Sequence, residues 1–194
     1  MRETVILSDV DGVLLNYVYG FDQWVKRHGV EQIPGTDHEW HFGVRYGLGD
    51  ERSMALIKEF NESAGIGFLP PLRDAIKYVR KLHEEHGYIF HAITSFGTDP
   101  HAVKLRQANL ERYFGVGVFE EIQCLPLGLP KAEALKRYAG TNCYWIEDHP
   151  VNSRAGQALG LDSILVNHSY NLHEEFSGPR VNTWSEVYAV ITGQ

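Results

Sequence analysis

The feature that most constrains this chain is a pair of carboxylates, Asp9 and Asp11, placed directly after the apolar run Val-Ile-Leu at residues 5–7. Such a run is typical of a buried strand. A carboxylate beside buried apolar residues is costly, and a second one adds repulsion, unless a cation or hydrogen-bond donors compensate. Gly12 lets the backbone turn sharply and approach a ligand closely. The segment therefore predicts a site for a metal ion and a phosphorylated ligand at the end of a parallel strand.

Two other interpretations of this segment have to be weighed. Asp and Gly are common turn residues, so residues 9–12 could form an Asx-type turn that ends a strand. A calcium-binding EF-hand loop requires glycine at its sixth position and a bidentate glutamate at its twelfth. A loop that starts at Asp9 has Leu14 and Gly20 at these positions, so the sequence excludes an EF-hand.

The rest of the chain alternates between strand-like and helix-like patterns. Gly87 is placed to end the first long helix after residue 70, and Asp99 with Pro100 is placed to begin the next one. This alternation predicts an α/β fold, a Rossmann-like doubly wound and mostly parallel sheet with helices on both faces. Strands are expected at residues 5–7, 88–94, 119–125, 142–146 and 163–166, and helices are expected to begin near residues 72, 99, 130, 150 and 183.

Residues 16–70 break the alternation. They hold two stretches with helical spacing of apolar residues around a loop-like stretch, and they are rich in aromatic residues. We therefore expect a small helical cap at residues 16–70, inserted into a core domain of residues 1–15 and 71–194. Most cap aromatics are expected to form its own core, while one or two could stack on a planar group of a substrate. The candidates for such stacking are Phe21, Trp24, Trp40 and Tyr46.

Two further segments carry groups suited to an anion. Thr94 and Ser95 end the strand expected at residues 88–94, where hydroxyls and free backbone N–H groups could hold phosphate oxygens. Lys131 is expected in the first turn of a helix. A lysine there opposes the helix dipole, so contact with an anion explains it better than helix stability does.

A second pair of acidic residues, Glu147 and Asp148, follows the strand expected at residues 142–146. Taken singly, the candidate residues have ordinary explanations as turn, surface or helix-capping residues. Taken together, they would meet at one edge of a parallel sheet, where the carboxylates need a divalent cation. The cation, the lysine and the hydroxyls would form a site for a phosphoryl group.

The ordered motifs Asp9-Val10-Asp11-Gly12, Thr94-Ser95, Lys131 and Glu147-Asp148 resemble the haloacid dehalogenase-like superfamily of phosphohydrolases over nearly the whole chain. The resemblance implies that Asp9 is a nucleophile that forms an aspartyl-phosphate. It implies that Asp11 is the general acid and then the general base. It also implies that Thr94 and Lys131, with Ser95 beside them, bind the transferring phosphoryl group.

The same resemblance implies Mg²⁺ as cofactor, held by Asp148, Asp9 and the main-chain carbonyl of Asp11, with Glu147 as an auxiliary ligand. Within the superfamily the sequence is most similar to 5′(3′)-deoxyribonucleotidases, on the basis of Ile93-Thr94-Ser95, Tyr113-Phe114-Gly115 and the cap aromatics. Many of those enzymes have aspartate at the position of Glu147. A (deoxy)nucleoside monophosphate is therefore the expected substrate. A phosphatase for sugar phosphates or other small metabolites, a phosphotransferase and a catalytically idle metabolite-binding protein stay open as alternatives.

The charge of the chain bears on its partners. A net charge of −7 without a Lys/Arg cluster disfavours broad contact with nucleic acid or an anionic membrane, but not the binding of a small phosphorylated metabolite through a metal. The chain shows neither a basic and then apolar leader nor an apolar stretch as long as a membrane span. We expect a cytoplasmic protein. The sequence does not predict an oligomeric state.

Overall fold

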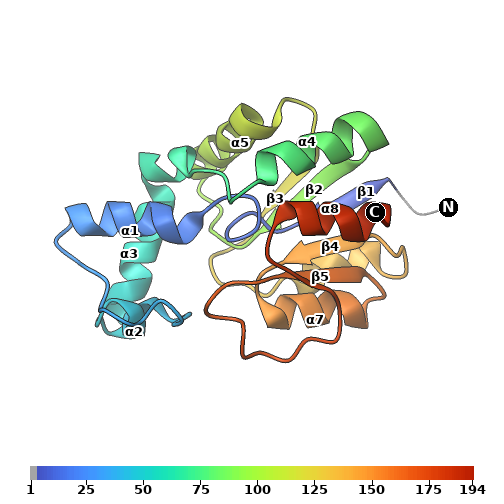
Figure 1. Cartoon of the computed structure of the whole chain (residues 1–194). Helices are drawn as coiled ribbons and strands as arrows, with labels where there is room; N and C mark the ends of the chain where they lie inside the picture. The colour runs from blue at the N-terminus through green and yellow to red at the C-terminus, as the bar shows by residue number, and fades with distance from the viewer. Residues whose placement is uncertain (1–3) are drawn as a thin grey trace.

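The protein, described here by a computed structural model over residues 4–194, is built on a parallel sheet (Figure 1). The strand order is β3-β2-β1-β4-β5-β6, and every neighbouring pair is parallel. This order confirms the predicted fold class. The strands are β1 (Val5–Ser8), β2 (Ile89–Thr94), β3 (Phe119–Cys124), β4 (Tyr144–Glu147), β5 (Asp162–Val166) and β6 (Arg180–Val181).

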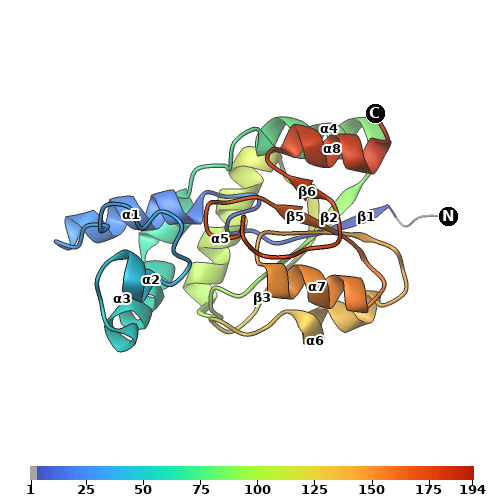
Figure 2. The same ribbon diagram turned by 60° about the horizontal axis from the view of Figure 1, so that its bottom comes forward.

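Helices cover both faces of the sheet, as Figure 2 shows. Helix α4 packs against both α5 and α8 on one face, and α6 and α7 lie together on the other. None of the helices described in residues 4–194 combines the length and the apolar character needed to cross a bilayer. The helices of the core are α4 (Ala75–His86), α5 (Pro100–Phe114), α6 (Ala132–Leu135), the 3₁₀ turn η2 (Lys136–Tyr138), α7 (Pro150–Ala158) and α8 (Trp184–Thr192).

Strand residues alternate between two apolar clusters, one on each face. Ile6 and Ile146 belong to the larger cluster, while Leu7, Ile93 and Trp145 belong to the smaller one on the side of α6 and η2. Successive residues of a strand point to opposite faces, so strands buried on both faces must be apolar throughout. This requirement explains why the central strands β1 and β4 appear in the sequence as short, mainly apolar runs.

Local capping signals begin and end the core helices as expected. The carboxylate of Asp99 accepts hydrogen bonds from the backbone N–H groups of His101 (3.0 Å) and Ala102 (2.9 Å), which caps α5. Gly87 ends α4 in a left-handed conformation, with φ at 71°. The helix expected from residue 130 differs from the prediction: it is only one α-helical turn, continued by η2, and Lys131 is its N-cap residue.

Residues 16–70, called the cap below, lie beyond one end of the sheet in Figure 1. Phe21 is central to their packing, with ring centroids 4.8 Å from Phe42, 5.5 Å from Tyr46 and 5.4 Å from Phe60. The division into a core domain and a cap stays a prediction, and the last cap element packs closely on α5 of the core. The cap elements are α1 (Tyr17–Arg27), α2 (Phe42–Arg45), α3 (Asp50–Glu62) and the 3₁₀ helix η1 (Ala64–Phe68).

The strand order determines where a ligand can bind. From β1 the chain adds β2 and β3 on one side and then β4, β5 and β6 on the other, so the order reverses at β1. Ligands of open parallel sheets bind beyond the carboxyl ends of the strands at such a reversal. Residues that directly follow β1, β2 and β4 are therefore the ones placed to form a site.

Candidate active site

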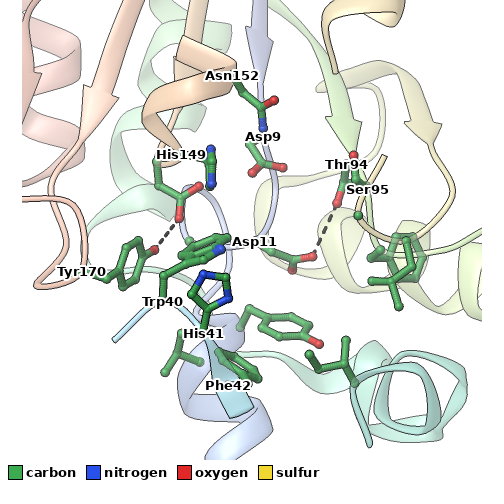
Figure 3. Close-up of a pocket in the computed structure, with 18 of the residues that line it drawn as sticks. Asp9, Asp11, Trp40, His41, Phe42, Thr94, Ser95, His149, Asn152 and Tyr170 are labelled. Atoms are coloured by element: carbon green, nitrogen blue, oxygen red, sulfur yellow. Dashed lines mark hydrogen bonds between the residues drawn. The ribbon is translucent and has the colours of Figure 1, made fainter. Parts of the chain in front are cut away.

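A cavity of about 520 Å³ lies between the carboxyl ends of the strands and the cap. The predicted residues at or just after the ends of β1, β2 and β4 all line it, together with Lys131 at the start of α6. In Figure 3, Trp40, His41 and Phe42 of the cap face Asp9 and Asp11 of the core across this cavity. The fold therefore brings the dispersed motifs of the sequence to one place.

Lys131 lies between two acidic residues. Its Nζ atom is 2.6 Å from Oδ2 of Asp9 and 2.8 Å from Oε2 of Glu147. The other oxygen of Glu147 accepts hydrogen bonds from the backbone N–H groups of Asp148 (3.2 Å) and His149 (3.0 Å). Glu147 is completely buried, so its position is fixed by the lysine and by the loop that it caps.

Asp148 stands beside the first acidic segment. An added Cβ at Gly12 would lie 2.4 Å from Oδ2 of Asp148, and Gly12 has φ at +83°, so this position requires glycine. The hydroxyl of Tyr170 donates a short hydrogen bond to the same oxygen, and His168 of the same loop lies 2.7 Å from the carbonyl oxygen of Gly12. The loop after β5 thus contacts both Asp148 and Gly12 and holds these two residues side by side.

Three acidic residues offer the oxygen ligands that a hard divalent cation requires. Asp9, Glu147 and Asp148 each offer a carboxylate oxygen, and these oxygens lie within 4.8 Å of one another. Oxygen donors of this kind suit Mg²⁺. Glu147 is completely buried and accepts from Lys131 and two backbone N–H groups, whereas Asp9 and Asp148 keep 6% and 2% exposure, so the two aspartates are better placed to reach a cation.

Burial and mutual repulsion raise the pKa values of these carboxyl groups. Burial raises the pKa of Glu147 to about 7, with Asp148 adding repulsion, although Lys131 acts in the opposite direction. Burial and then the charge of Asp9 raise the pKa of Asp148 to about 7. Burial lowers the pKa of Lys131, but the charges of Asp9 and Glu147 outweigh it and raise that pKa above its usual range. A bound cation would offset the repulsion between the carboxylates that contributes to these raised pKa values.

This electrostatic arrangement predicts that Mg²⁺ stabilises the protein more at about pH 8 than at about pH 5. The unfolded pKa values are about 4, so between that value and about 7 the folded, metal-free protein binds more protons than the unfolded chain. Its stability therefore falls as the pH rises through this window, and above it the deprotonated site is free to bind the metal. Thermal unfolding across this range, with Mg²⁺ or with EDTA, measures the effect. A Mg²⁺ effect independent of pH, or one that survives in Asp148→Asn, would contradict this account.

Asp11 points away from the acidic cluster, toward Thr94 (Figure 3). Its Oδ1 is 2.8 Å from Nη1 of Arg106, and its Oδ2 accepts from Nη2 of Arg106 at 2.9 Å and from the Thr94 hydroxyl at 3.4 Å. The Ser95 hydroxyl, by contrast, donates to the carbonyl oxygen of Leu129 at 2.7 Å. The two aspartates of the first motif therefore have different partners: a lysine for Asp9 and an arginine for Asp11.

The four aromatic candidates separate into two groups. Trp40 lines the cavity and packs edge-on against His149 and Tyr170, with ring centroids 4.8 Å and 4.9 Å apart. Phe21, Trp24 and Tyr46 are absent from the cavity wall and pack against other aromatic rings of the cap.

Sequence reasoning missed Arg106 and Tyr170. A signal existed for Arg106, because Ala102 and Leu110 lie four residues before and after it on α5 and all three are buried. An arginine on the buried face of a helix needs an acidic partner. Tyr170 lies in a loop after β5 without periodicity, so nothing in the local sequence marks its contact with Asp148.

Comparison with known proteins adds to this picture. No protein-family model matches the sequence. An uncharacterized 32.4 kDa protein of Enterobacteria phage T4, from the gp30–rIII intergenic region, is 29% identical over 137 residues, which cover 68% of this chain and 48% of the phage protein. The match therefore spans about half the length of that relative.

Solved structures match over nearly the whole chain. A haloacid dehalogenase-like family hydrolase from Streptococcus pneumoniae has a TM-score of 0.67 at 15% identity, with 98% of this chain and 99% of that one covered. This chain has the haloacid dehalogenase-like fold. CbbY from Rhodobacter sphaeroides, in complex with phosphate, matches at a TM-score of 0.60 and 18% identity, covering 95% and 96% of the two chains. The putative hydrolase YfnB from Bacillus subtilis, bound to magnesium, matches at 0.61 and 13%, covering 99% and 100%.

Proposed function

We propose that this protein is a Mg²⁺-dependent phosphatase that hydrolyses a small phosphomonoester through an aspartyl-phosphate on Asp9. The observation that carries the proposal is the Asp9–Lys131 contact of 2.6 Å inside a cluster of buried carboxylates. It puts a carboxylate oxygen next to a cation at the reversal point of a parallel sheet. The fold neighbours, among them one solved with phosphate and one with magnesium, support the same chemistry.

Asp9 is the proposed nucleophile. Its Oδ1 accepts from the backbone N–H of Val10 at 2.6 Å, which orients the carboxylate, while Oδ2 faces Lys131. In the first step an Asp9 oxygen bonds to phosphorus and the ester P–O bond breaks, with Asp11 giving its proton to the leaving oxygen. In the second step water attacks phosphorus, Asp11 takes the proton from that water, and phosphate leaves with the Asp9 carboxylate restored.

The other residues of the site would bind the phosphoryl group and neutralise its negative charge. Lys131 and the Thr94 hydroxyl would bind the oxygens of the phosphoryl group, and Glu147 would hold Lys131 in place. Mg²⁺, held by Asp9, Asp148 and the Asp11 carbonyl, would neutralise negative charge on the phosphoryl oxygens. Lys131 and Mg²⁺ are both needed because the anionic Asp9 carboxylate and the anionic substrate repel each other.

The proposed substrate is a (deoxy)nucleoside monophosphate. The cavity volume of about 520 Å³ is ample for a molecule of this size, and Trp40 offers an aromatic surface at its cap side. Trp40 is also 44% exposed, so one of its surfaces is free for a ligand. Sugar phosphates and transfer of the phosphoryl group to a second hydroxyl are the competing outcomes, as is a protein that binds a phosphorylated metabolite without turnover.

A substrate screen tests this proposal. In Mg²⁺, purified protein is expected to release phosphate faster from nucleoside monophosphates than from sugar phosphates. Phosphate release is expected to stop when EDTA is added. Trp40→Ala is expected to lower kcat/KM for nucleotides about 10-fold, the effect of losing one stacked base, and to leave sugar phosphates almost unchanged. Trp24→Ala is the matched control, because Trp24 packs inside the cap with Phe21 and Phe60.

The outcomes of this screen separate the alternatives. Turnover in EDTA would refute the metal dependence, and no turnover of any phosphomonoester would favour the idle binding protein. An equal loss with both substrate classes in Trp40→Ala would assign Trp40 to packing. Phosphate transferred to an added alcohol in preference to water would identify a phosphotransferase.

A further inference from the structure

Arg106 of α5 occupies an unusual place for an arginine. It is fully buried, and its guanidinium lies 4.7 Å from the centre of the Phe96 ring. Burying a cation costs several kcal/mol, and a buried ion pair is often no more stabilising than apolar residues of the same volume. Stability alone therefore does not account for Arg106.

The partner of Arg106 is Asp11. Its two terminal nitrogens lie 2.8 Å and 2.9 Å from the two carboxylate oxygens of Asp11. The 2.9 Å contact is a hydrogen bond, and the 2.8 Å contact is an ion pair without hydrogen-bond geometry. This two-point contact, called the fork below, restrains both oxygens of the carboxylate, which the single ammonium group of a lysine does not do. The Thr94 hydroxyl, at 3.4 Å, is a much weaker restraint on Asp11.

Arg106 and Asp11 differ in their access to the cavity. The Asp11 side chain is 19% exposed and lines the cavity, whereas the Arg106 side chain is 0% exposed and does not. Arg106 thus lies behind Asp11 as seen from a bound ligand. It can orient the carboxyl group of Asp11, but it cannot reach a substrate.

We propose that Arg106 is a positioning residue, which holds the Asp11 carboxyl group where it exchanges a proton first with the leaving oxygen and then with water. The proposal rests on the proposed phosphatase activity. Phe96 supports Arg106 in this role, because its ring covers the guanidinium and its carbonyl oxygen accepts from Asn61 of the cap at 2.7 Å. The carboxyl group of Asp11 is therefore held in place by a residue of α5 that lies 95 positions away in the sequence.

Leaving-group dependence tests this role. Nitrophenolate leaves without a proton, whereas an alkoxide does not, and kcat/KM reports only the steps up to transfer of the phosphoryl group to Asp9. In Arg106→Met, the ratio of kcat/KM for 4-nitrophenyl phosphate to that for an alkyl phosphate is expected to rise about 10-fold or more, toward the ratio for Asp11→Asn. Arg106→Lys, which keeps the charge but not the fork, is expected to lie between Arg106→Met and the unchanged protein.

Arg112→Met is the matched control. Arg112 lies on the same helix and stacks on Phe68 at 4.9 Å, but it donates to the carbonyl oxygen of Gly67 and does not line the cavity. Its replacement is expected to leave the ratio unchanged. If Arg106→Met lowers kcat/KM for both substrates equally, or raises KM for both by one factor, Arg106 is a structural or substrate-binding residue and the proposal is wrong.

A crystal structure of Arg106→Met judges the proposal without any activity. The Asp11 carboxylate is expected to leave its present orientation once the fork is gone. An unchanged Asp11 would overturn the positioning role even if the protein is a phosphatase. Conversely, a reoriented Asp11 in a protein that hydrolyses no phosphomonoester would refute the proposed function and still assign the orientation of Asp11 to Arg106.

Discussion

Asp9→Asn is expected to reduce turnover of phosphomonoesters by about 10⁴-fold or more, because the amide cannot serve as the nucleophile. The fold should persist. Asparagine has the same shape, and Lys131 keeps Glu147 as its partner at 2.8 Å. The change also removes one of the charges that repel each other in the cluster, since burial and Glu147 raise the pKa of Asp9.

Acid-quenched reactions with phosphate-labelled substrate measure the first step directly. The unchanged protein is expected to carry label on an aspartate, and Asp9→Asn is expected to carry none. Glu85→Gln, at an exposed carboxylate on α4, controls for the loss of a charge. Turnover of Asp9→Asn within about 100-fold of the unchanged protein would remove Asp9 from the nucleophile role.

Lys131→Met is expected to abolish activity and also to lower the free energy of unfolding by about 3–5 kcal/mol near neutral pH. The lysine is the partner of both Asp9 and Glu147, and Glu147 is completely buried. Removing it leaves a buried carboxylate with no cation. Urea unfolding monitored by circular dichroism measures the stability change, and phosphate release measures the activity.

The double variant Lys131→Met with Glu147→Gln separates the two effects. Without the charge of Glu147, most of the lost stability should return, while the activity should stay lost because the phosphoryl group still lacks its lysine. Lys136→Met, at an exposed lysine paired with Glu133 at 2.5 Å, is the surface control and should change neither measurement. Recovery of activity in the double variant would show that Lys131 only neutralises Glu147.

The fold could be predicted from the sequence because the central strands β1 and β4 are buried on both faces. Ile6 and Leu7 point to opposite apolar clusters, so β1 appears in the sequence as an unbroken apolar run. The elements that were missed are short. β6 has two residues and α2 has four, too few for any periodicity to develop.

The locations of the motif residues were also predictable. Asp9, Thr94 and Asp148 each stand at or just after the end of a parallel strand, and parallel strands bring such ends to one edge. Contacts between side chains were not predictable in this way. Lys131 was expected to face a phosphate, and that role stays a prediction. In the structure its Nζ atom contacts Asp9 and Glu147, and the sequence does not indicate the contact with Glu147.

The amino-acid sequence by itself determined the α/β layers and the edge of the sheet at which the acidic residues gather, because both follow from local periodicity and from strand ends. Only the tertiary structure decided that Asp11 pairs with Arg106, that Tyr170 donates to Asp148, and that Trp40 rather than Trp24 lines the cavity. These choices depend on which helix face and which loop meet the site in space. A pattern within a few neighbouring residues cannot predict such contacts, since Arg106 lies 95 positions from Asp11 and Tyr170 lies 22 positions from Asp148.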